Sequence, residues 1–348
     1  MNDRFLRACR LEPVDKTPVW FMRQAGRYMS EYRELRQKYS LIELCQTPDL
    51  ATIVTLQPVK SIDVDAAIIF SDLLLPLSPM GIQFDFVKGE GPVIDPPIRS
   101  SETINQLIIF EPREKLDYVL KAIRQVRTEL GNNLPLIGFA GAPFTLASYA
   151  IEGGHSNGYT LTKTFMYSEP VAWHKLCEKL STIIIDYLTA QIEAGVQAVQ
   201  LFDSWVGALN PLDYREFILP HTQHILSTVG RLGVPVIHFG TGTAAILTEM
   251  REAGGDVIGI DWRIPLDHAW EKIGVDHAIQ GNLDPVMLLG PVDRLVAGAN
   301  DILKRADNKL GHIFNLGHGI LPNTPIEHVQ LLARYVHEHR NNQITIDS

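Results

Sequence analysis

Two arginines, Arg23 and Arg27, flank a glycine in a largely apolar segment that runs from residue 20 to residue 28. An arginine in apolar surroundings is costly unless its charge is paired. One interpretation is therefore an internal ion pair with a carboxylate such as Asp72 or Glu34. The other is an anion clamp, because the planar guanidinium fork binds carboxylates through two parallel hydrogen bonds. The residue types alone leave both interpretations open.

Polar side chains recur where buried apolar runs end along the chain. In an α/β barrel the chemistry collects at the carboxyl ends of the strands, where the βα loops meet. Each such residue has an ordinary alternative explanation, since Ser, Asp and Asn are favoured at helix N-caps. The recurrence of the series favours a shared site. The residues at or just past the ends of the runs are Asp72, Gly141, Asp203, Ser204, His238, Asp261, Asn282 and His318.

These positions belong to seven short apolar runs, each followed by a helical stretch such as Arg113–Leu130 or Pro170–Gly195. Continuous apolar runs are typical of parallel strands that are covered on both faces. The order of strand and helix predicts an α/β protein, a TIM (β/α)8 barrel with an active-site cleft at the C-terminal ends of its strands. A doubly wound open sheet is the alternative. The runs are Ala66–Phe70, Leu136–Ala140, Ala198–Phe202, Val234–Phe239, Val257–Ile260, His277–Gln280 and His312–Leu316.

The eighth strand has two candidates, Pro18–Met22 and the region Pro92–Ile98, of which the second could instead form a hairpin. No linker divides the chain, so we expect a single domain over residues 1–348, with the polar stretch 341–348 as a frayed tail. Leu134–Ile151 is uncharged over 18 residues, which is the threshold for a membrane span. Its glycines and prolines indicate a strand, a turn and the start of a helix instead.

Composition limits the class of protein. The 348 residues are 45% hydrophobic and 20% charged, which is ordinary for a globular protein. The net charge of −9 disfavours a nucleic-acid or membrane-surface role. The three cysteines form no CxxC pair, so neither a disulfide framework nor a zinc cluster is indicated. The first residues lack the hydrophobic core of a signal peptide, and we expect a cytoplasmic protein.

Two segments resemble the signatures of the uroporphyrinogen decarboxylase family: residues 18–28 (PVWFMRQAGRY) and residues 138–149 (GFAGAPFTLASY). Further blocks match in the family's order, and together they extend from about residue 3 to residue 340. One departure is Trp205, which follows Ser204 where some members carry His. The further blocks are Ile69–Asp72, Leu201–Ser204, Ile260–Trp262, Gln280–Pro285 and Asn315–Gly319.

The resemblance implies a carboxy-lyase of tetrapyrrole (haem or chlorophyll) biosynthesis. Such an enzyme converts the four acetate side chains of uroporphyrinogen III to methyl groups, giving coproporphyrinogen III and four CO2. The family uses neither a metal nor an organic cofactor, and its members are homodimers. The substrate is a polyanion, so its site must be locally basic although the chain as a whole is acidic.

The resemblance also implies roles for single residues. Asp72 would accept hydrogen bonds from the pyrrole N–H groups and stabilise the protonated ring. Arg23 and Arg27 would hold acetate and propionate groups, and Arg23 is further implied in catalysis, although a guanidinium is a poor general acid at pH 7. The segment between them, Gln24, Ala25 and Gly26, would complete the substrate-binding turn.

Tyr149, Ser204 and His318 would hydrogen-bond substrate carboxylates by the same resemblance. Each also has an ordinary alternative. Tyr149 could be a core aromatic with a satisfied hydroxyl, Ser204 a helix cap and His318 a loop histidine between glycines. With the family pattern around them, the functional interpretation is favoured for all three.

Three rival functions differ from the decarboxylase in the residues that they require. The first rival is a dinucleotide-binding protein, because a strand at residues 234–239 precedes G-x-G-x-x-A, with Asp261 about 20 residues further on. In a barrel the same glycines simply allow a tight turn.

The second rival is a corrinoid–thiol methyltransferase. These enzymes share the decarboxylase fold but bind zinc through His-x-Cys and a later Cys. Here His238 is followed by Phe239 and Gly240, and the last cysteine of the chain is Cys177. The cysteine ligands of such a zinc site are therefore missing. The third rival is a non-catalytic binding protein.

Overall fold

A curved parallel sheet forms the centre of the molecule in the computed structural model, which describes residues 2–87, 91–154 and 156–339. Its strands follow one another in chain order, β1-β4-β5-β6-β7-β8-β9, and every neighbouring pair is parallel. All seven overlap the predicted apolar runs. They are β1 (Ala67–Ile68), β4 (Leu136–Gly141), β5 (Ala198–Asp203), β6 (Val236–Gly240), β7 (Val257–Gly259), β8 (Ala278–Gln280) and β9 (His312–Ile313).

The segment around Val19 joins the two edges of this sheet. Val19 forms a parallel bridge with Phe314, just past β9. On its other side the Val19 carbonyl accepts a hydrogen bond of 2.8 Å from the amide of Asp65, just before β1. Pro18–Met22, the first of the two candidates for the eighth strand, is therefore the element that closes the barrel. Among the described residues it forms one isolated parallel bridge and not a regular strand.

The other candidate region, Pro92–Ile98, lies outside the barrel. Its first residues belong to β3 (Gly91–Ile94), which pairs with β2 (Phe84–Val87) in an antiparallel two-stranded sheet. The region thus adopts the hairpin that the sequence analysis gave as its alternative to a barrel strand. The hairpin is tied to the barrel by the amide of Ile94, which donates to the Gly153 carbonyl at 2.8 Å.

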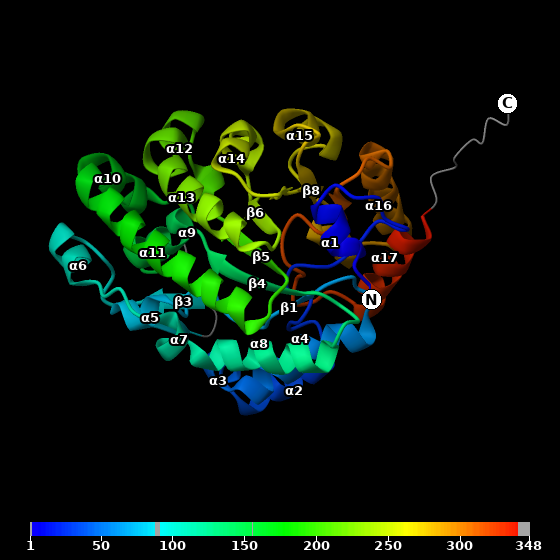
Figure 1. Cartoon of the computed structure of the whole chain (residues 1–348), viewed down its shortest axis with the longest axis horizontal. Helices are drawn as coiled ribbons and strands as arrows, with labels where there is room; N and C mark the ends of the chain where they lie inside the picture. Colours follow the sequence, from blue (N-terminus) through cyan, green and yellow to red (C-terminus); the bar gives the residue numbers. More distant parts are fainter. Residues whose placement is uncertain (1, 88–90, 155, 340–348) are drawn as a thin grey trace.

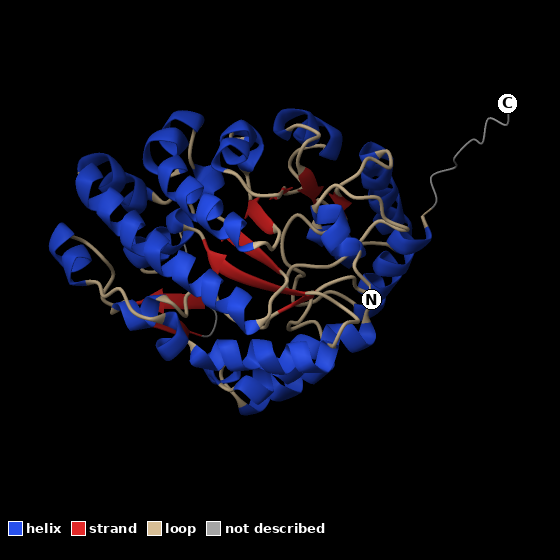
Figure 2. Cartoon of the chain, in the orientation of Figure 1, coloured by secondary structure: helices blue, strands red, loops and turns tan. Residues whose placement is uncertain are grey.

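Helices enclose the sheet, so that the strands are buried on both faces (Figures 1 and 2). Arg113–Leu130 divides into α7 and α8, while α11 matches its prediction and ends where Gly195 takes a φ of 117°. The helices are α1 (Arg4–Cys9), α2 (Ser30–Lys38), α3 (Leu41–Gln46), α4 (Pro48–Ser61), α5 (Leu77–Met80), α6 (Ser101–Gln106), α7 (Pro112–Lys115), α8 (Asp117–Leu130), α9 (Pro143–Glu152), α10 (Thr160–Ser168), α11 (Pro170–Ala194), α12 (Pro211–Phe217), α13 (Leu219–Val229), α14 (Leu247–Ala253), α15 (Leu266–Ile273), α16 (Val292–Ala306) and α17 (Ile326–Glu338).

Polar side chains cross the barrel interior without meeting water. The amide of Gln280 donates to Gln200 at 3.0 Å, and its oxygen accepts from the indole N–H of Trp20 at 3.0 Å. All three residues are buried. Buried polar groups are tolerated where they satisfy one another. This network links β5, β8 and the closing segment, and so fixes their alignment.

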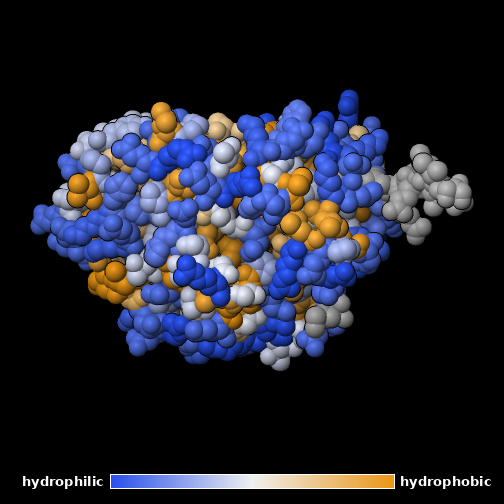
Figure 3. Space-filling view, turned by 45° about the horizontal axis from the view of Figure 1, so that its top comes forward, coloured by the Kyte–Doolittle hydropathy of each residue, from blue (hydrophilic) through white to orange (hydrophobic). Residues whose placement is uncertain are grey.

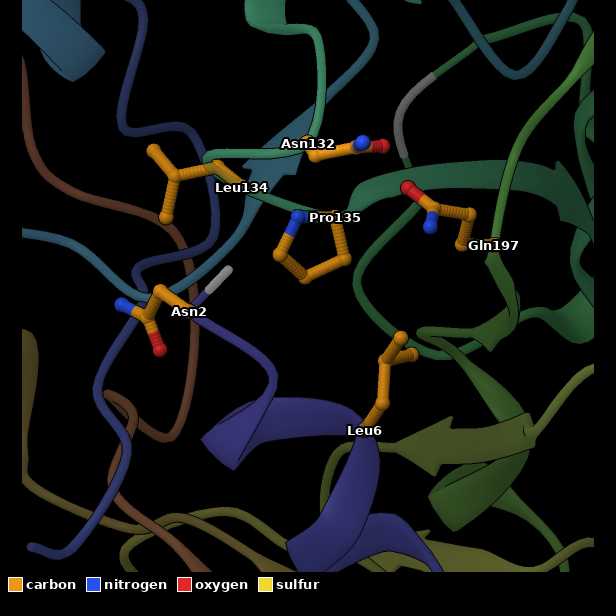
Figure 4. A pocket seen from close by; sticks show the side chains of 6 residues that line it. All are labelled: Asn2, Leu6, Asn132, Leu134, Pro135 and Gln197. Carbon is orange, nitrogen blue, oxygen red and sulfur yellow. The ribbon is translucent and has the colours of Figure 1, made fainter.

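The amino-terminal end of the barrel is covered by α1. Asn2 and Arg4 both bond to Asp65, at 2.7 Å and 2.6 Å, just before β1. Figure 4 shows a shallow hollow at the same end, where Asn2 and Leu6 face Pro135 and the side chain of Gln197. The open end that can receive a ligand is therefore the opposite one, at the carboxyl ends of the strands, called the mouth below.

Two further expectations concern a membrane span and the tail at residues 341–348. None of the helices in the described ranges combines the length and apolar character that crossing a bilayer requires. Leu134–Ile151 forms β4, a Pro turn and most of α9, as predicted. The face shown in Figure 3 is mostly hydrophilic, with apolar side chains in separate groups. The expected frayed tail at 341–348 lies outside the described residues.

Candidate active site

The two arginines of the first signature sit on a turn that Gln24 holds in place. The buried Gln24 side chain accepts from the amide of Phe21 at 3.1 Å and donates to the carbonyl of Ala66 at 3.1 Å. The Tyr28 hydroxyl donates to the carbonyl of Gln24 at 2.5 Å. The Gln24 side chain is thus occupied with the backbone, and its role is to shape the turn that presents Arg23 to the mouth.

Arg23 and Arg27 are both exposed, and neither forms an ion pair with any of the described residues. The internal ion pair with Asp72 or Glu34 is therefore absent from this part of the chain. Ala25 and Gly26 lie between the arginines and are half-buried. Arg23 has a φ of 57°, a left-handed conformation that is uncommon for a residue with a side chain. Both guanidinium groups remain available to an external anion.

Asp72 follows β1 at the mouth and is half-buried. One carboxylate oxygen accepts from the amide of Leu74 at 2.9 Å, which fixes the side chain within its own turn. Burial raises the pKa of Asp72 above its usual value, while the Leu74 amide and the positive charge of Arg23 oppose that rise. Asp72 is therefore a partly desolvated carboxylate, and the charge of Arg23 favours its ionised form.

Tyr149 lies near the end of α9 and packs on Trp205, with ring centroids 3.9 Å apart. Burial and the negative charge of Asp72 raise the pKa of Tyr149 to about 12, and Arg23 acts in the opposite direction. The phenol is therefore protonated at neutral pH and can donate a hydrogen bond. Trp205, the departure from the family pattern, forms a wall of the mouth beside Tyr149.

Ser204 directly follows β5, and its backbone is held from two sides. The Thr241 hydroxyl donates to the carbonyl of Ser204. The amide of Trp205 donates to the Thr145 hydroxyl at 3.3 Å, and that hydroxyl donates to buried Asp203 at 2.9 Å. Burial raises the pKa of Asp203 to about 7. Asp203 thus faces the helices and supports the turn, whereas Ser204 is half-buried at the mouth.

His318 lies between two glycines that allow a close approach on both sides. A Cβ on Gly319 would collide with the side chain of Arg23, and one on Gly317 would lie 2.6 Å from the amide of Trp262. Burial lowers the pKa of His318 to about 4, with smaller contributions from Arg23 and Arg263. The imidazole is therefore neutral at pH 7 and offers one donor and one acceptor.

The other strand-end candidates have structural roles. His238 is buried within β6, and burial lowers its pKa to about 4. It lies inside the strand rather than at its end, so its expected place among the strand-end residues is wrong. Asn282 donates to the carbonyls of Asp261 and Ile264 at 2.9 Å and 2.7 Å. Gly141 is the last residue of β4.

Asp261 accepts from the amide of Gly242 at 2.7 Å and forms an ion pair with Arg263. The glycines of the G-x-G pattern therefore serve contacts between loops. A Cβ on Gly207 would collide with the backbone of Thr241 and Gly242. The pattern that resembled a dinucleotide-binding loop is explained by this packing.

Sequence reasoning missed Arg263. It follows β7 on the loop that approaches His318, and its guanidinium lies 4.2 Å from the ring centroid of Trp262. A signal was present in the sequence, because Arg263 comes two residues after the strand-end Asp261 and directly follows the block Ile260–Trp262. In the described parts of the chain no group of three or more His, Cys, Asp or Glu side chains is arranged to hold a metal ion.

Two arginines, Arg23 and Arg263, thus lie at one end of the barrel with a partly buried carboxylate, a phenol and a neutral imidazole. Such a set can hold several carboxylates around one central anionic group. A model of the family described as uroporphyrinogen decarboxylase (URO-D) matches residues 1–339. The chain belongs to the uroporphyrinogen decarboxylase family.

Curated members of the uroporphyrinogen decarboxylase family resemble this chain over nearly its whole length. A uroporphyrinogen decarboxylase of Sorangium cellulosum is 58% identical over 337 residues, which are 97% of this chain and 96% of the relative. One from Chloroflexus aurantiacus is 57% identical over the same shares of both chains. One from Carboxydothermus hydrogenoformans is 53% identical over 97% of each.

Solved structures show the same fold at lower identity. A methyltransferase from Methanosarcina mazei superposes with a TM-score of 0.81 at 22% identity, covering 96% of this chain and 97% of that one. A B12-independent methionine synthase from Shewanella gives a TM-score of 0.55 at 10% identity, covering 83% and 85%. These likenesses bear on the fold alone. They agree with the predicted TIM barrel rather than with a doubly wound open sheet.

Proposed function

We propose that the chain decarboxylates the four acetate side chains of uroporphyrinogen III, giving coproporphyrinogen III and four CO2 in tetrapyrrole biosynthesis. The observation that carries this proposal at the site is that Arg23 and Arg27 form no ion pair among the described residues, while the charge of Arg23 acts on the partly buried Asp72. A ligand with several carboxylates around central N–H groups fits this arrangement, because its carboxylates can bind the arginines and its N–H groups can bind the carboxylate. The curated relatives, named uroporphyrinogen decarboxylase at 53–58% identity, support the same activity.

The reaction must remove CO2 from a carbon that cannot hold the bonding electrons. A proton adds to the pyrrole carbon next to the one that bears the acetate, and the ring becomes a cation. The bond between the acetate methylene and its carboxylate then breaks, and its electron pair neutralises the ring. A second proton converts the exocyclic methylene to a methyl group, and the first proton leaves. Each turnover consumes one proton and releases one CO2.

Asp72 is the group we assign to the ring cation. Its carboxylate accepts hydrogen bonds from the pyrrole N–H groups, and its negative charge becomes most favourable when the ring is positive. The Leu74 amide holds one oxygen, so the carboxylate is pre-oriented before the substrate binds. Partial burial strengthens the interaction, because less water screens the charges.

Arg23 and Arg27 hold substrate carboxylates in this proposal, and Arg23 contributes to catalysis through its position beside Asp72. Ala25 and Gly26 leave room between them, while Gln24 fixes the turn. The Tyr149 phenol, the Ser204 hydroxyl and the neutral His318 add hydrogen bonds to carboxylates. These assignments follow the resemblance and the placement of the side chains at the mouth.

The direct test is turnover. Purified protein is incubated anaerobically with uroporphyrinogen III, and the porphyrins recovered after oxidation are separated by their number of carboxyl groups. We expect conversion of the eight-carboxylate substrate to the four-carboxylate product. A chain that binds the tetrapyrrole without losing carboxyl groups would instead be a binding protein, and the proposed activity would be wrong.

The proposal includes independence from metals and organic cofactors. Activity should survive dialysis against EDTA, and the purified protein should carry no visible chromophore. A reversible loss of turnover on metal removal, restored by one metal ion, would contradict the proposed chemistry. Dialysis against buffer alone is the matched control.

We further propose that residues 1–348 act as one domain in a cytoplasmic homodimer. The dimer rests on the family resemblance, and exposed apolar side chains such as Val171 and Leu212 supply surface that association would bury. Sedimentation equilibrium should give twice the chain mass. A monomer mass at working concentration would overturn the dimer, and two separate unfolding transitions would argue against one domain.

A further inference from the structure

Arg263 is a cation at the mouth that the proposed function does not yet use. It follows β7 on the loop that carries Asp261 and Trp262. Its side chain is 52% exposed, although Asp261 beside it is fully buried. An arginine whose only task is to neutralise a buried acid is itself expected to be buried, because exposure weakens the ion pair.

The Arg263 guanidinium is held before any ligand binds. One terminal nitrogen bonds to Asp261, and the planar group lies 4.2 Å from the ring centroid of Trp262. Asp261 is in turn fixed by the amides of Gly242 and Arg263, at 2.7 Å and 3.2 Å. A guanidinium has five N–H donors, so several remain for a ligand. Restriction before binding lowers the entropy cost of forming a new contact.

Contacts on both sides of His318 place Arg263 in the same site as Arg23. Gly319 packs against the side chain of Arg23, and Gly317 packs against the backbone of Asp261 and Trp262. His318 therefore lies between the turn of Arg23 and the loop of Arg263. The positive charges of both arginines reach the imidazole and lower its pKa, consistent with this arrangement.

We propose that Arg263 is a further substrate-binding residue, which holds a carboxylate of the tetrapyrrole that does not react in that turnover. The inference rests on the proposed function and names a second anion position in the same site. The reacting acetate belongs near Asp72 and Arg23. A carboxylate on the far side of His318 must come from another substituent of the macrocycle, so Arg263 contributes to affinity rather than to the chemical step.

The test compares R263Q and R263K with the parent chain. Binding of coproporphyrinogen III, which has four propionates and no acetate, is measured anaerobically by equilibrium dialysis. We expect R263Q to raise Kd and the KM for uroporphyrinogen III by about tenfold, with kcat within about twofold. R263K keeps the charge but loses the fork, so its Kd should lie between those of the parent and R263Q.

R215Q is the matched control. Arg215 also pairs with acids, Glu249 and Glu252, but belongs to α12 among the outer helices. Its Kd and KM should equal those of the parent. If R263Q binds like the parent, the proposal is overturned. Parental binding by R263K would overturn the part of the proposal that rests on the guanidinium fork, because a point charge at position 263 would then suffice.

Failure of the proposed function would be distinguishable from failure of this inference. A parent chain that binds coproporphyrinogen III without decarboxylating uroporphyrinogen III loses the proposed activity, while the Kd of R263Q still decides the role of Arg263. A parent chain that binds no coproporphyrinogen III overturns the role of Arg263 directly. Melting temperatures of all variants separate weak binding from loss of fold.

Discussion

Arg23 and Asp72 carry opposite charges at the same end of the barrel, yet no nitrogen of Arg23 comes within 4.0 Å of an Asp72 oxygen. The arginine charge still acts on the pKa of the carboxylate. Because the two groups do not neutralise each other by direct contact, each can bind a different part of a ligand.

Asp72→Asn should lower the decarboxylation rate by roughly 10²-fold or more. The amide oxygen of Asn can still accept from the Leu74 amide, so the turn should survive and the protein should melt near the parent temperature. Asp72→Glu keeps the charge but moves it by one methylene, and intermediate activity is expected. A capping role alone would instead lose about 1 kcal/mol of stability and little activity. Near-parental turnover by folded Asp72→Asn would remove Asp72 from the mechanism.

Arg27→Ala should weaken substrate binding by about 2–5 kcal/mol if the carboxylate contact is well desolvated. Arg23→Ala should reduce kcat at least as much as it raises KM, because Arg23 also acts on Asp72. Lysine at either position should restore only part of the loss, since the fork geometry is missing. Steady-state kinetics on all four variants provide the measurement, and near-normal values for both alanine variants would leave the arginines without the proposed role.

The pH dependence of kcat/KM should report the ionisation of Asp72. Burial raises its pKa, and activity that needs the carboxylate is lost as pH falls through that raised value. Arg23→Gln removes a positive charge that holds the pKa down, so the acid limb of its residual activity should move to higher pH. Arg23→Lys keeps the charge and should leave the limb near its parental position. An unchanged limb in Arg23→Gln would show that another group controls it.

Arg23→Gly and Arg23→Ala should differ in stability but not in activity. The left-handed φ of 57° at this position costs a residue with a Cβ about 1 kcal/mol, whereas glycine adopts it freely. Both variants lose the guanidinium and should be equally slow. Urea unfolding should therefore show the glycine variant to be the more stable of the two. Equal stability would mean that the turn relaxes once the arginine is removed.

His337 should make stability depend on pH at the end of the barrel opposite the mouth. Burial alone would lower its pKa, but Asp65 at 2.7 Å and Asp63 at 2.9 Å outweigh burial and raise it. The stabilisation by protonated His337 is fully present below the pKa of a histidine in the unfolded chain, about 6.5. It is lost as pH rises through the higher pKa of His337 in the folded chain. The melting temperature should thus fall as pH rises across this range.

His337→Asn should have a lower melting temperature at pH 6 and a flatter profile between pH 6 and 9. The pKa of Asp65 is lowered, since bonds from His337 and Asn2 outweigh its burial, so a separate loss on the acid side is expected in the parent. His268→Asn, at a more exposed histidine on α15, is the control. A parental slope in His337→Asn would exclude this pair as its source.

The strands were predictable because a buried parallel strand needs a continuous apolar run, which is a local property. Ala198–Phe202 became β5 and Val257–Ile260 became β7 with shifts of one residue. The closing strand was not decided locally. Pro18–Met22 makes one bridge and takes its partners from Phe314 and Asp65, which lie far away in sequence.

The residue types of the site were predictable from the sequence, but the directions of their side chains were not. His238 was expected at a strand end, yet it is buried within β6. Asp203 does end β5, but its carboxylate accepts from Thr145 of α9. Strand side chains alternate between two faces, so an error of one residue in a strand's end reverses the direction of a side chain. Arg263 was missed because its role depends on how close its loop comes to His318.

By itself the sequence determined the apolar runs, their order with the helices, and the motifs that resemble the uroporphyrinogen decarboxylase family. These are properties of residue type and spacing along the chain. Only the tertiary structure decided that Arg23 and Arg27 remain unpaired among the described residues, and that Asp72, Tyr149 and His318 share one end of the barrel. The physical reason is that pairing and desolvation depend on distances between atoms from different loops, and closure of the barrel sets those distances.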